Sequence, residues 1–370
     1  MRAIVISRVY ADPAARGKLK ALAALGVSVA AAVPDRWSPL GLGTEHRTVF
    51  GEEGGVRTVP IAVRGSTASG ADPLWNRGAL RRLLNDFRPE IVQIEEEPWT
   101  RAAVIAAGLA RRLRVPYVVL TGESLSGGHG ALGRLRRARV LGRAKGLIAV
   151  NGVAAKLGTR QHASIEHQVI PQLGVSLPLQ TARRTEPGLA IGFFGRLIPE
   201  KGLDLLFRAC VKLIGRWTIT VVGTGPAQEE LEGLAERLGI AGRVTWLGAL
   251  PRQRVDEIWP GLDVVVLPSR TAPRWVERMP RAAMEAMANG VAVIASGAGA
   301  LPEIVGPAGV VVAEEDVVAI AEALQRLHDD PAERDRLASQ GRQRVMAEYT
   351  DAAIAGKTLR FWQRLIAANG

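Results

Sequence analysis

The sequence predicts an α/β protein with two doubly wound domains that face a cleft. Short β-branched runs alternate with longer segments in which apolar residues recur every three or four positions. Many runs are apolar on both faces, which is typical of parallel strands covered by helices on both sides. A stretch rich in Pro, Thr and Arg at 176–188 interrupts the alternation and indicates a linker.

The first half predicts a domain at 1–178, in which seven runs read as strands and segments between them as helices. The strands are expected at Ala3–Ser7, Val27–Val33, Val56–Val63, Ile91–Ile94, Tyr117–Thr121, Leu147–Val150 and Gln168–Ile170, with helices such as Lys18–Leu25 and Ala102–Leu113.

The second half repeats the alternation and predicts a domain at 187–348. Its strands are expected at Leu189–Phe194, Trp217–Val222, Val244–Leu247, Asp263–Leu267, Val291–Ala295 and Val310–Val312, and its helices at Leu203–Leu213, Ala227–Leu238, Arg281–Ala288 and Val317–Leu327. The remaining segment, 349–370, has helical apolar spacing. We expect a helix that packs back on the first domain; the alternative is an ordinary last helix of the second domain.

Composition excludes several classes of protein. A chain of 370 residues suits two domains of roughly 100–200 residues each. The single cysteine, Cys210, excludes a disulfide framework and a cysteine-only zinc site, and suits a reducing cytoplasm. No apolar stretch approaches the ~18–20 residues that span a bilayer. The first residues predict a strand and not a signal peptide.

The positive charge is concentrated in the first half. Residues 1–178 hold 25 Lys/Arg against 13 Asp/Glu, whereas the rest holds 23 of each, so the first half carries the whole net charge of +12. Its densest part is Arg134, Arg136, Arg137, Arg139, Arg143 and Lys145. This cluster is either a solvated surface or a site of attraction to anionic lipid. Nucleic acid is disfavoured because aromatic residues are not interleaved with the basic ones.

Candidate ligand-binding residues follow the strands of the second half, where doubly wound sheets bind ligands. Arg196 and Lys201 share one strand-to-helix loop and suit a diphosphate; the alternative is a pair of surface cations. The turn at Gly223 lets backbone approach a ligand but lacks the lysine of a P-loop. Glu277 falls in a loop and Glu285 on the next helix, and either carboxylate could accept from sugar hydroxyls or be an ordinary helix charge.

Taken in order, these segments resemble the C-terminal domain of family-4 retaining glycosyltransferases with the two-domain GT-B fold. The matching text is FFGRLIPEKGLDLLFRA, VVGTGP, VTWLGALP, LDVVVLPSR, the Glu277–Glu285 pair leading into EAMANGVAVIAS, and AGALPEIVG. The resemblance covers roughly 187–345. The first half matches more loosely, chiefly in IVQIEEEPW.

The resemblance implies a role for each matching residue. Arg196 and Lys201 would hold the donor diphosphate, Glu277 the donor sugar and Glu285 the ribose. We take Arg196, Lys201 and Glu277 as the catalytic group. Gly223, Ala249, Leu250 and Arg281 complete the expected donor site in this domain, close to the nucleotide and to the amino end of the Arg281–Ala288 helix.

No metal and no cofactor are expected besides a UDP-, GDP- or ADP-sugar substrate. No Asp-x-Asp ends a strand, and the five histidines are scattered. Fixed cations and a helix amino terminus can stabilise the leaving diphosphate. Retaining members of the family are thought to use front-face attack, in which the donor phosphate helps to take the acceptor's proton, so no carboxylate nucleophile is sought.

The chain departs from the family in two places. Met279-Pro280 stands where the family has Phe-Gly, which removes one backbone donor near the substrate, although proline suits the first turn of a helix. The first-domain residues do not align clearly. Gly17, beside Lys18, is the candidate donor-binding glycine, and Glu97, Glu123 and His129 are candidates on the acceptor side; the alternatives are solvated carboxylates and an ordinary loop histidine.

The sequence therefore predicts a cytoplasmic glycosyltransferase that is peripheral on the inner membrane face. Its acceptor would be a lipid-linked or envelope glycan, in polysaccharide biosynthesis. The alternatives are a nucleotide-sugar epimerase of similar fold, a non-catalytic descendant that acts as a binding or scaffold protein, and a basic nucleic-acid binder.

Overall fold

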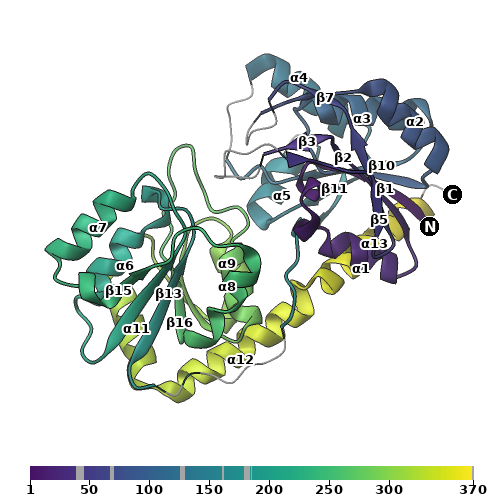
Figure 1. Ribbon diagram of the computed structural model, residues 1–370. Helices are drawn as coiled ribbons and strands as arrows, with labels where there is room; N and C mark the ends of the chain where they lie inside the picture. Colours follow the sequence, from purple (N-terminus) through teal and green to yellow (C-terminus); the bar gives the residue numbers. More distant parts are fainter. Residues whose placement is uncertain are drawn as a thin grey trace. The chain divides into compact units, whose positions relative to one another are not determined.

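The computed structural model describes residues 1–38, 46–66, 71–125, 130–160, 162–178, 184 and 186–368. It divides into two compact units (Figure 1). Unit 1 consists of Met1–Gly174 together with Asp351–Gly370, and unit 2 is Val175–Thr350. In the described part of the chain, no helix combines the length and the apolar character needed to cross a membrane.

Unit 1 is built on an eight-stranded sheet in the order β12-β11-β10-β9-β1-β2-β6-β5, in which only the β5–β6 pair is antiparallel. The strands are β1 (Arg2–Ile6), β2 (Ser28–Pro34), β5 (Gly51–Glu53), β6 (Val56–Ile61), β9 (Ile91–Ile94), β10 (Tyr117–Thr121), β11 (Gly146–Ala149) and β12 (Glu166–Val169). The inner strands are fully buried, as the runs without polar alternation predicted.

Unit 1 also contains two short antiparallel pairs, β3 (Arg36–Trp37) with β4 (His46–Arg47) and β7 (Val63–Arg64) with β8 (Leu74–Trp75). The sequence did not predict these pairs, because a strand of two residues shows no periodicity. The helices of unit 1 are α1 (Gly17–Ala24), α2 (Arg77–Phe87), α3 (Arg101–Arg112), α4 (Gly130–Leu141), α5 (Gly152–Thr159) and α13 (Asp351–Ala367), with short 3-10 turns at Val9–Ala11 and Pro13–Ala15.

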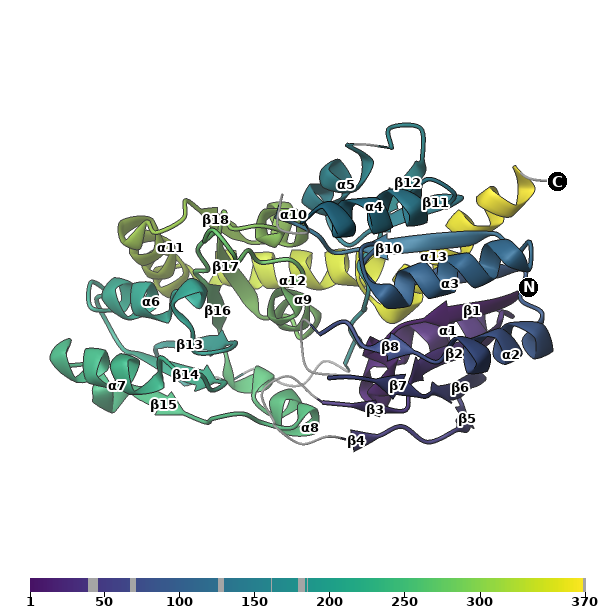
Figure 2. The same ribbon diagram turned by 90° about the horizontal axis from the view of Figure 1, so that it is seen from above.

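The C-terminal helix α13 packs on unit 1 and lies beside α1 (Figure 2). Phe361 and Trp362 are fully buried there, and a Cβ on Gly146 of β11 would meet Phe361 at 2.8 Å. The indole Nε1 of Trp362 donates to Oε1 of Gln93 on β9 at 2.8 Å. The expected return of this helix to the first domain is confirmed, and the alternative is wrong.

Unit 2 is built on a parallel six-stranded sheet in the order β15-β14-β13-β16-β17-β18. The strands are β13 (Leu189–Phe194), β14 (Trp217–Val222), β15 (Val244–Trp246), β16 (Val264–Leu267), β17 (Ala292–Ser296) and β18 (Val310–Val312). Apolar side chains fill one core on each face of the sheet, which is the doubly wound arrangement.

The helices of unit 2 are α6 (Leu203–Cys210), α7 (Gln228–Arg237), α8 (Arg252–Asp256), α9 (Arg281–Ala288), α10 (Leu301–Val305), α11 (Val317–Asp329) and α12 (Pro331–Glu348). Short 3-10 turns occur at Pro199–Lys201, Ala241–Arg243, Trp259–Gly261 and Gly306–Ala308. The sequence predicted no separate helix at α12, because only four of its 18 residues are buried. Its start is marked instead by Asp330, whose carboxylate accepts from the backbone N–H of Glu333 at 2.9 Å.

Candidate active site

The carboxyl edge of the unit 2 sheet brings together the loops after β13, β14 and β15. The N–H of Gly223 donates to the carbonyl of Gly248 at 2.8 Å, which ties the β14 loop to the β15 loop. Gly223 has φ +136, and a Cβ there would lie 1.8 Å from the carbonyl oxygen of Gly195. Only glycine fits such a contact between backbones. Gly223 is therefore required for packing three candidate loops together.

Lys201 and Glu277 come from different loops and form an ion pair. Lys201 ends the Pro199–Lys201 turn, and its Nζ lies 2.5 Å from Oε2 of Glu277, with the two side chains 19% and 10% exposed. The next residue, Gly202, has φ +70, and a Cβ on it would meet the carbonyl of Pro268 at 2.0 Å. A glycine is again needed, because the lysine turn lies directly against the β16 loop.

Two residues that sequence reasoning missed complete this pair. The hydroxyl of Ser269 donates to the same Oε2 of Glu277 at 3.2 Å. The Nζ of Lys201 lies 5.4 Å from the ring centroid of Trp275, within the range of a cation–π contact. Both residues belong to the stretch LPSRTAPRWVE. The polar residues and the tryptophan of this stretch, which follows a buried strand, were the available signal.

The backbone of Glu277 is fixed as firmly as its side chain. Its carbonyl accepts from the N–H of Ala300 at 2.8 Å, and a Cβ on Gly299, at φ +55, would lie 2.1 Å from that carbonyl oxygen. The glutamate thus sits against the loop after β17 as well as against Lys201. The backbone carbonyl and Oε2 of Glu277 are both bonded, so its side chain is already ordered. Its other oxygen, Oε1, can accept from a ligand without a further loss of side-chain entropy.

Arg196 occupies the same loop as Lys201 but is exposed. Within the part of the chain that the structure describes, its guanidinium forms no ion pair. One cation of the loop is therefore held by a carboxylate, and the other faces solvent. Such a pair suits an anion that approaches from solvent.

Glu285 and Arg281 lie one turn apart on α9. Nη2 of Arg281 donates to Oε1 of Glu285 at 3.1 Å, and both side chains are partly buried. The N–H of Arg281 donates to the carbonyl of Met279, and Pro280 lies directly before the first helical residue. The expectation that Pro280 belongs to the first turn is thus corrected by one position.

The remaining donor-side candidates in unit 2 follow β15. Ala249 is exposed, and Leu250 is partly buried against the core that contains Trp259. Gly248, just before them, is bonded to Gly223. The unit 2 candidates therefore come from the loops after β13, β14, β15 and β16 and from the first turns of α9.

The described candidates of unit 1 make contacts within unit 1. A Cβ on Gly17 would lie 2.0 Å from the carboxylate of Asp351, so α13 accounts for this glycine. The carboxylate of Glu97 accepts from the hydroxyl of Thr121 at 2.8 Å and from the N–H of Gly122 at 2.9 Å. His129 lies outside the described residues. The alternative of solvated carboxylates is wrong for Glu97.

Glu123 pairs with Arg137, which the basic cluster had included. The two side chains are 7% and 13% exposed, and Arg137 also donates to the carbonyl of Leu157 at 2.7 Å. Arg136 lies 3.7 Å from Asp72. The guanidinium of Arg137 therefore bonds inside unit 1 and does not belong to the surface that was expected to face lipid. Arg134, Arg139 and Arg143 remain exposed.

A buried polar network in unit 1 was also missed. The Nζ of Lys18 donates to Oε1 of Glu95 at 2.5 Å, with the two side chains 1% and 0% exposed. Oε1 also accepts from Gln93 at 2.5 Å and from the hydroxyl of Tyr10 at 3.2 Å. Burial and the adjacent Glu95 carboxylate raise the pKa of Tyr10 well above its usual value. Nothing in the sequence shows that residues 77 positions apart are paired.

Two family models match the chain. The glycosyl transferase 4-like domain matches residues 11–172, and glycosyl transferases group 1 matches residues 181–344. Both matches agree with the domain order that the sequence resemblance implied.

Two relatives illustrate the sequence similarity. The 2-deoxystreptamine glucosyltransferase of Streptomyces kanamyceticus is 26% identical over 329 residues, which are 80% of this chain and 84% of that enzyme. A GDP-mannose-dependent monoacylated alpha-(1-6)-phosphatidylinositol monomannoside mannosyltransferase of Corynebacterium glutamicum is 35% identical over 161 residues. That match spans 42% of each chain, so it concerns less than half of the mannosyltransferase.

A solved structure extends the likeness to the whole fold. The HepE protein of Anabaena, crystallised in complex with UDP, superposes with a TM-score of 0.73 over 98% of this chain and all of that chain. Its sequence is 18% identical, so the likeness concerns the fold.

Proposed function

Because the chain belongs to the family-4 glycosyltransferases of the two-domain GT-B fold, we propose that it is a retaining, metal-independent enzyme. It transfers a hexose from a nucleoside-diphosphate sugar to a lipid-linked or envelope-glycan acceptor. The observation that supports this most is the Lys201–Glu277 pair beside the exposed Arg196. A cation and a carboxylate meet there at the sheet edge where such folds bind nucleotides.

In the proposed mechanism the donor diphosphate replaces Glu277 as the ion-pair partner of Lys201. Its β-phosphate lies between Lys201 and Arg196, and Glu277 is released to accept hydrogen bonds from the sugar hydroxyls. Ser269 and the backbone contacts keep the carboxylate in place during this exchange. The two cations then stabilise the charge that develops on the leaving diphosphate as the sugar–oxygen bond breaks.

The proposed transfer retains the configuration at the anomeric carbon. The acceptor hydroxyl attacks from the face that the diphosphate leaves, and a phosphate oxygen takes the hydroxyl proton. The new glycosidic bond forms as the old sugar–phosphate bond breaks, so the products are the glycoside and the protonated nucleoside diphosphate. No carboxylate nucleophile is needed.

A donor panel tests this proposal. UDP, GDP, ADP and their hexose conjugates are added to the intact protein in EDTA, and thermal unfolding is followed. A ligand at 100 times its dissociation constant stabilises by about 2.7 kcal/mol. We expect one nucleotide to shift the transition, with the shift lost in Arg196→Ala and Glu285→Ala. Product NMR then reads the anomeric configuration, and an inverted product or a strict requirement for added metal contradicts the proposal.

The acceptor proposal is supported by the outer face of α4. Leu132 and Leu135 are 60% and 66% exposed, and they share this face with the exposed Arg139. A helix face that combines leucines with arginine suits an anionic membrane surface. The names of the two relatives point to different acceptors, 2-deoxystreptamine in one and a phosphatidylinositol monomannoside in the other. The family match alone therefore does not identify the acceptor.

Vesicle pelleting tests the lipid part. We expect binding to vesicles with anionic lipid and weak binding to neutral ones, reduced by Leu135→Ser and Arg139→Ala. The matched control is Arg336→Ala on α12, an exposed arginine in unit 2. Equal pelleting with neutral and anionic vesicles contradicts a lipid-facing role for α4.

Met279-Pro280 supports one alternative, a binding protein descended from the enzyme. The loop that carries Glu277 reaches α9 through a proline, which lacks the N–H that glycine would supply there. If the protein binds a nucleotide but transfers no sugar, the Met279→Phe, Pro280→Gly double variant separates the possibilities. Restored transfer identifies a drifted enzyme, and continued inactivity favours the binding role. Conversion of a donor sugar into its isomer without acceptor would instead identify an epimerase.

A further inference from the structure

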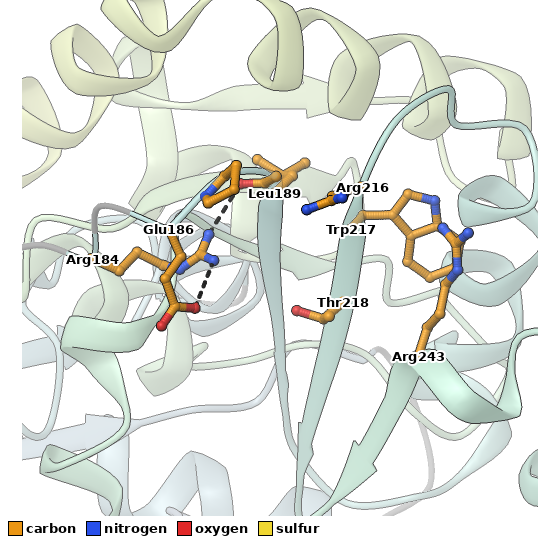
Figure 3. Close-up of a pocket in the computed structure, with 9 residues that line it drawn as sticks. Arg184, Glu186, Leu189, Arg216, Trp217, Thr218 and Arg243 are labelled. Atoms are coloured by element: carbon orange, nitrogen blue, oxygen red, sulfur yellow. Dashed lines mark hydrogen bonds and ion pairs between the residues drawn. The ribbon is translucent and has the colours of Figure 1, made fainter.

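A pocket lies at the opposite edge of the unit 2 sheet from the candidate active site. It has a volume of about 400 Å³ and is formed where β13 and β14 begin, by the segment before β13 and by Arg243 (Figure 3). Since β13 has six residues and a strand advances about 3.3 Å per residue, the pocket lies about 20 Å from the loops at the carboxyl ends. A ligand there would not overlap a donor bound at those loops.

One wall of the pocket is preformed. Nη1 of Arg184 donates to Oδ2 of the buried Asp263 at 2.8 Å and to the carbonyl of Gly188 at 3.0 Å. Gly188 has φ +99, and a Cβ on it would lie 2.6 Å from the carbonyl of Arg216. Backbone contact thus holds this segment against β14. The charge of Arg184 is already matched by Asp263.

The other wall carries cations that are not matched. Arg216 and Arg243 are exposed, and neither forms an ion pair with any residue that the structure describes. The guanidinium of Arg243 stacks 4.6 Å from the ring centroid of the buried Trp217, which restricts its position. Figure 3 shows Arg216 and Arg243 on the side of the pocket away from Glu186, with Thr218 between Glu186 and Arg243. The second half of the chain has equal numbers of acidic and basic residues, so the excess of positive charge at this wall is local.

The two walls differ in the chemistry that they offer. Arginine forks bind phosphate oxygens in pairs of hydrogen bonds. The carboxylate of Glu186 is 81% exposed and can accept from hydroxyl groups, and the Thr218 hydroxyl can donate or accept. Pockets of a few hundred Å³ hold small metabolites. An anion at one end and hydroxyls at the other are the features of a sugar phosphate.

We propose that this pocket binds a phosphate monoester of the size of a hexose phosphate. The phosphate lies between Arg216 and Arg243, and the hydroxyls face Glu186 and Thr218. The site is separate from the donor site, so the monoester and a nucleotide bind together.

Calorimetry with glucose 1-phosphate as the probe tests the proposal on the intact protein, with and without a saturating concentration of the nucleotide that the donor panel identifies. We expect the same affinity in both, a loss of at least tenfold in Arg216→Ala and in Arg243→Ala, and partial retention in Arg243→Lys. Arg336→Ala is the control and should change nothing. Titration of the same variants with that nucleotide should be unaffected, which separates this site from the proposed transferase site.

Three results overturn the proposal. They are unchanged probe affinity in both alanine variants, loss of probe binding when the nucleotide is added, and inorganic phosphate binding as tightly as the monoester. Hydrogen exchange at the start of β13 and β14 gives an independent reading. We expect the probe to protect these amides in the parent protein and in Arg336→Ala, and not in Arg216→Ala.

Discussion

Each unit contains a Lys–Glu pair at 2.5 Å in which both side chains are largely shielded from solvent, and these two pairs differ in their surroundings. Lys18–Glu95 of unit 1 is 1% and 0% exposed, and Gln93 and Tyr10 bond the same carboxylate oxygen. Lys201–Glu277 of unit 2 is 19% and 10% exposed, and it lies on glycine-dependent loops. A pair sealed from water leaves a ligand no access to either partner, whereas a pair that water reaches can exchange one partner for a ligand. Burial, and not residue type or distance, separates the structural pair from the proposed functional one.

The comparison predicts its largest effect in unit 1. Lys18→Met leaves the Glu95 carboxylate buried without its cation, and breaking a buried pair in this way costs about 3–5 kcal/mol of stability. We expect chemical denaturation to show this loss, with hydrogen exchange accelerated across β9 and α1. The control is Lys20→Met, since that lysine pairs with Glu53 at the surface. A loss below about 1 kcal/mol would mean that water reaches the Lys18 pair after all.

The corresponding change in unit 2 should affect turnover more than stability. In the proposed mechanism, Lys201→Met removes a cation from the leaving diphosphate, and loss of one such group typically slows catalysis by about 10²–10³. We expect the thermal transition to move little, because the pair is partly open to solvent. Steady-state kinetics with the donor identified by the panel measure the effect, and Lys212→Met is the matched control. Unchanged turnover would place the pair among structural contacts.

The secondary structure of unit 2 was largely predicted from the sequence. Its six strands and the start of α9 follow from uninterrupted apolar runs and spacing. The Lys201–Glu277 contact does not follow, because two loops 76 residues apart are joined only by the sheet order. Neither does the role of Ser269, since a serine after a strand has many functions.

Unit 1 shows which contacts of its candidate residues the sequence did not predict. Glu123 and Arg137 were assigned to an acceptor and to a membrane, but the fold places them against each other. Gly17 was assigned to a ligand and meets Asp351, more than 300 positions away. Charge and glycine content indicate that a segment is special, but only the fold shows what fills the space beside it.

A smaller effect should distinguish α13 from the helices of unit 2. Trp362→Phe keeps the apolar packing but leaves Oε1 of Gln93 without the indole donor. A buried acceptor without its partner costs about 1–3 kcal/mol. Denaturant titration should show this loss, and exchange should increase in unit 1 while unit 2 keeps its protection. Equal increases in both units would contradict the assignment of α13 to unit 1.

The smallest effect concerns alkaline pH. Burial raises the pKa of Tyr117 to about 12, and its hydroxyl donates to the carbonyl of Val140 at 2.7 Å. The unfolded chain loses this proton near pH 10, so stability falls as the pH rises from about 10 to about 12. Tyr117→Phe should cost about 1 kcal/mol at pH 7 and flatten this decline. Denaturation midpoints at several pH values measure it, and parallel curves for parent and variant would contradict the assignment.

The last helix also sets the order in which the protein can be completed. Unit 1 encloses residues from both ends of the described chain, and Phe361 and Trp362 fill its core. During synthesis the first 174 residues leave the ribosome long before these side chains exist. Unit 2 has all of its strands and helices by Thr350 and can fold while its neighbour still waits. Unit 1 therefore begins to emerge before unit 2 and is completed after it.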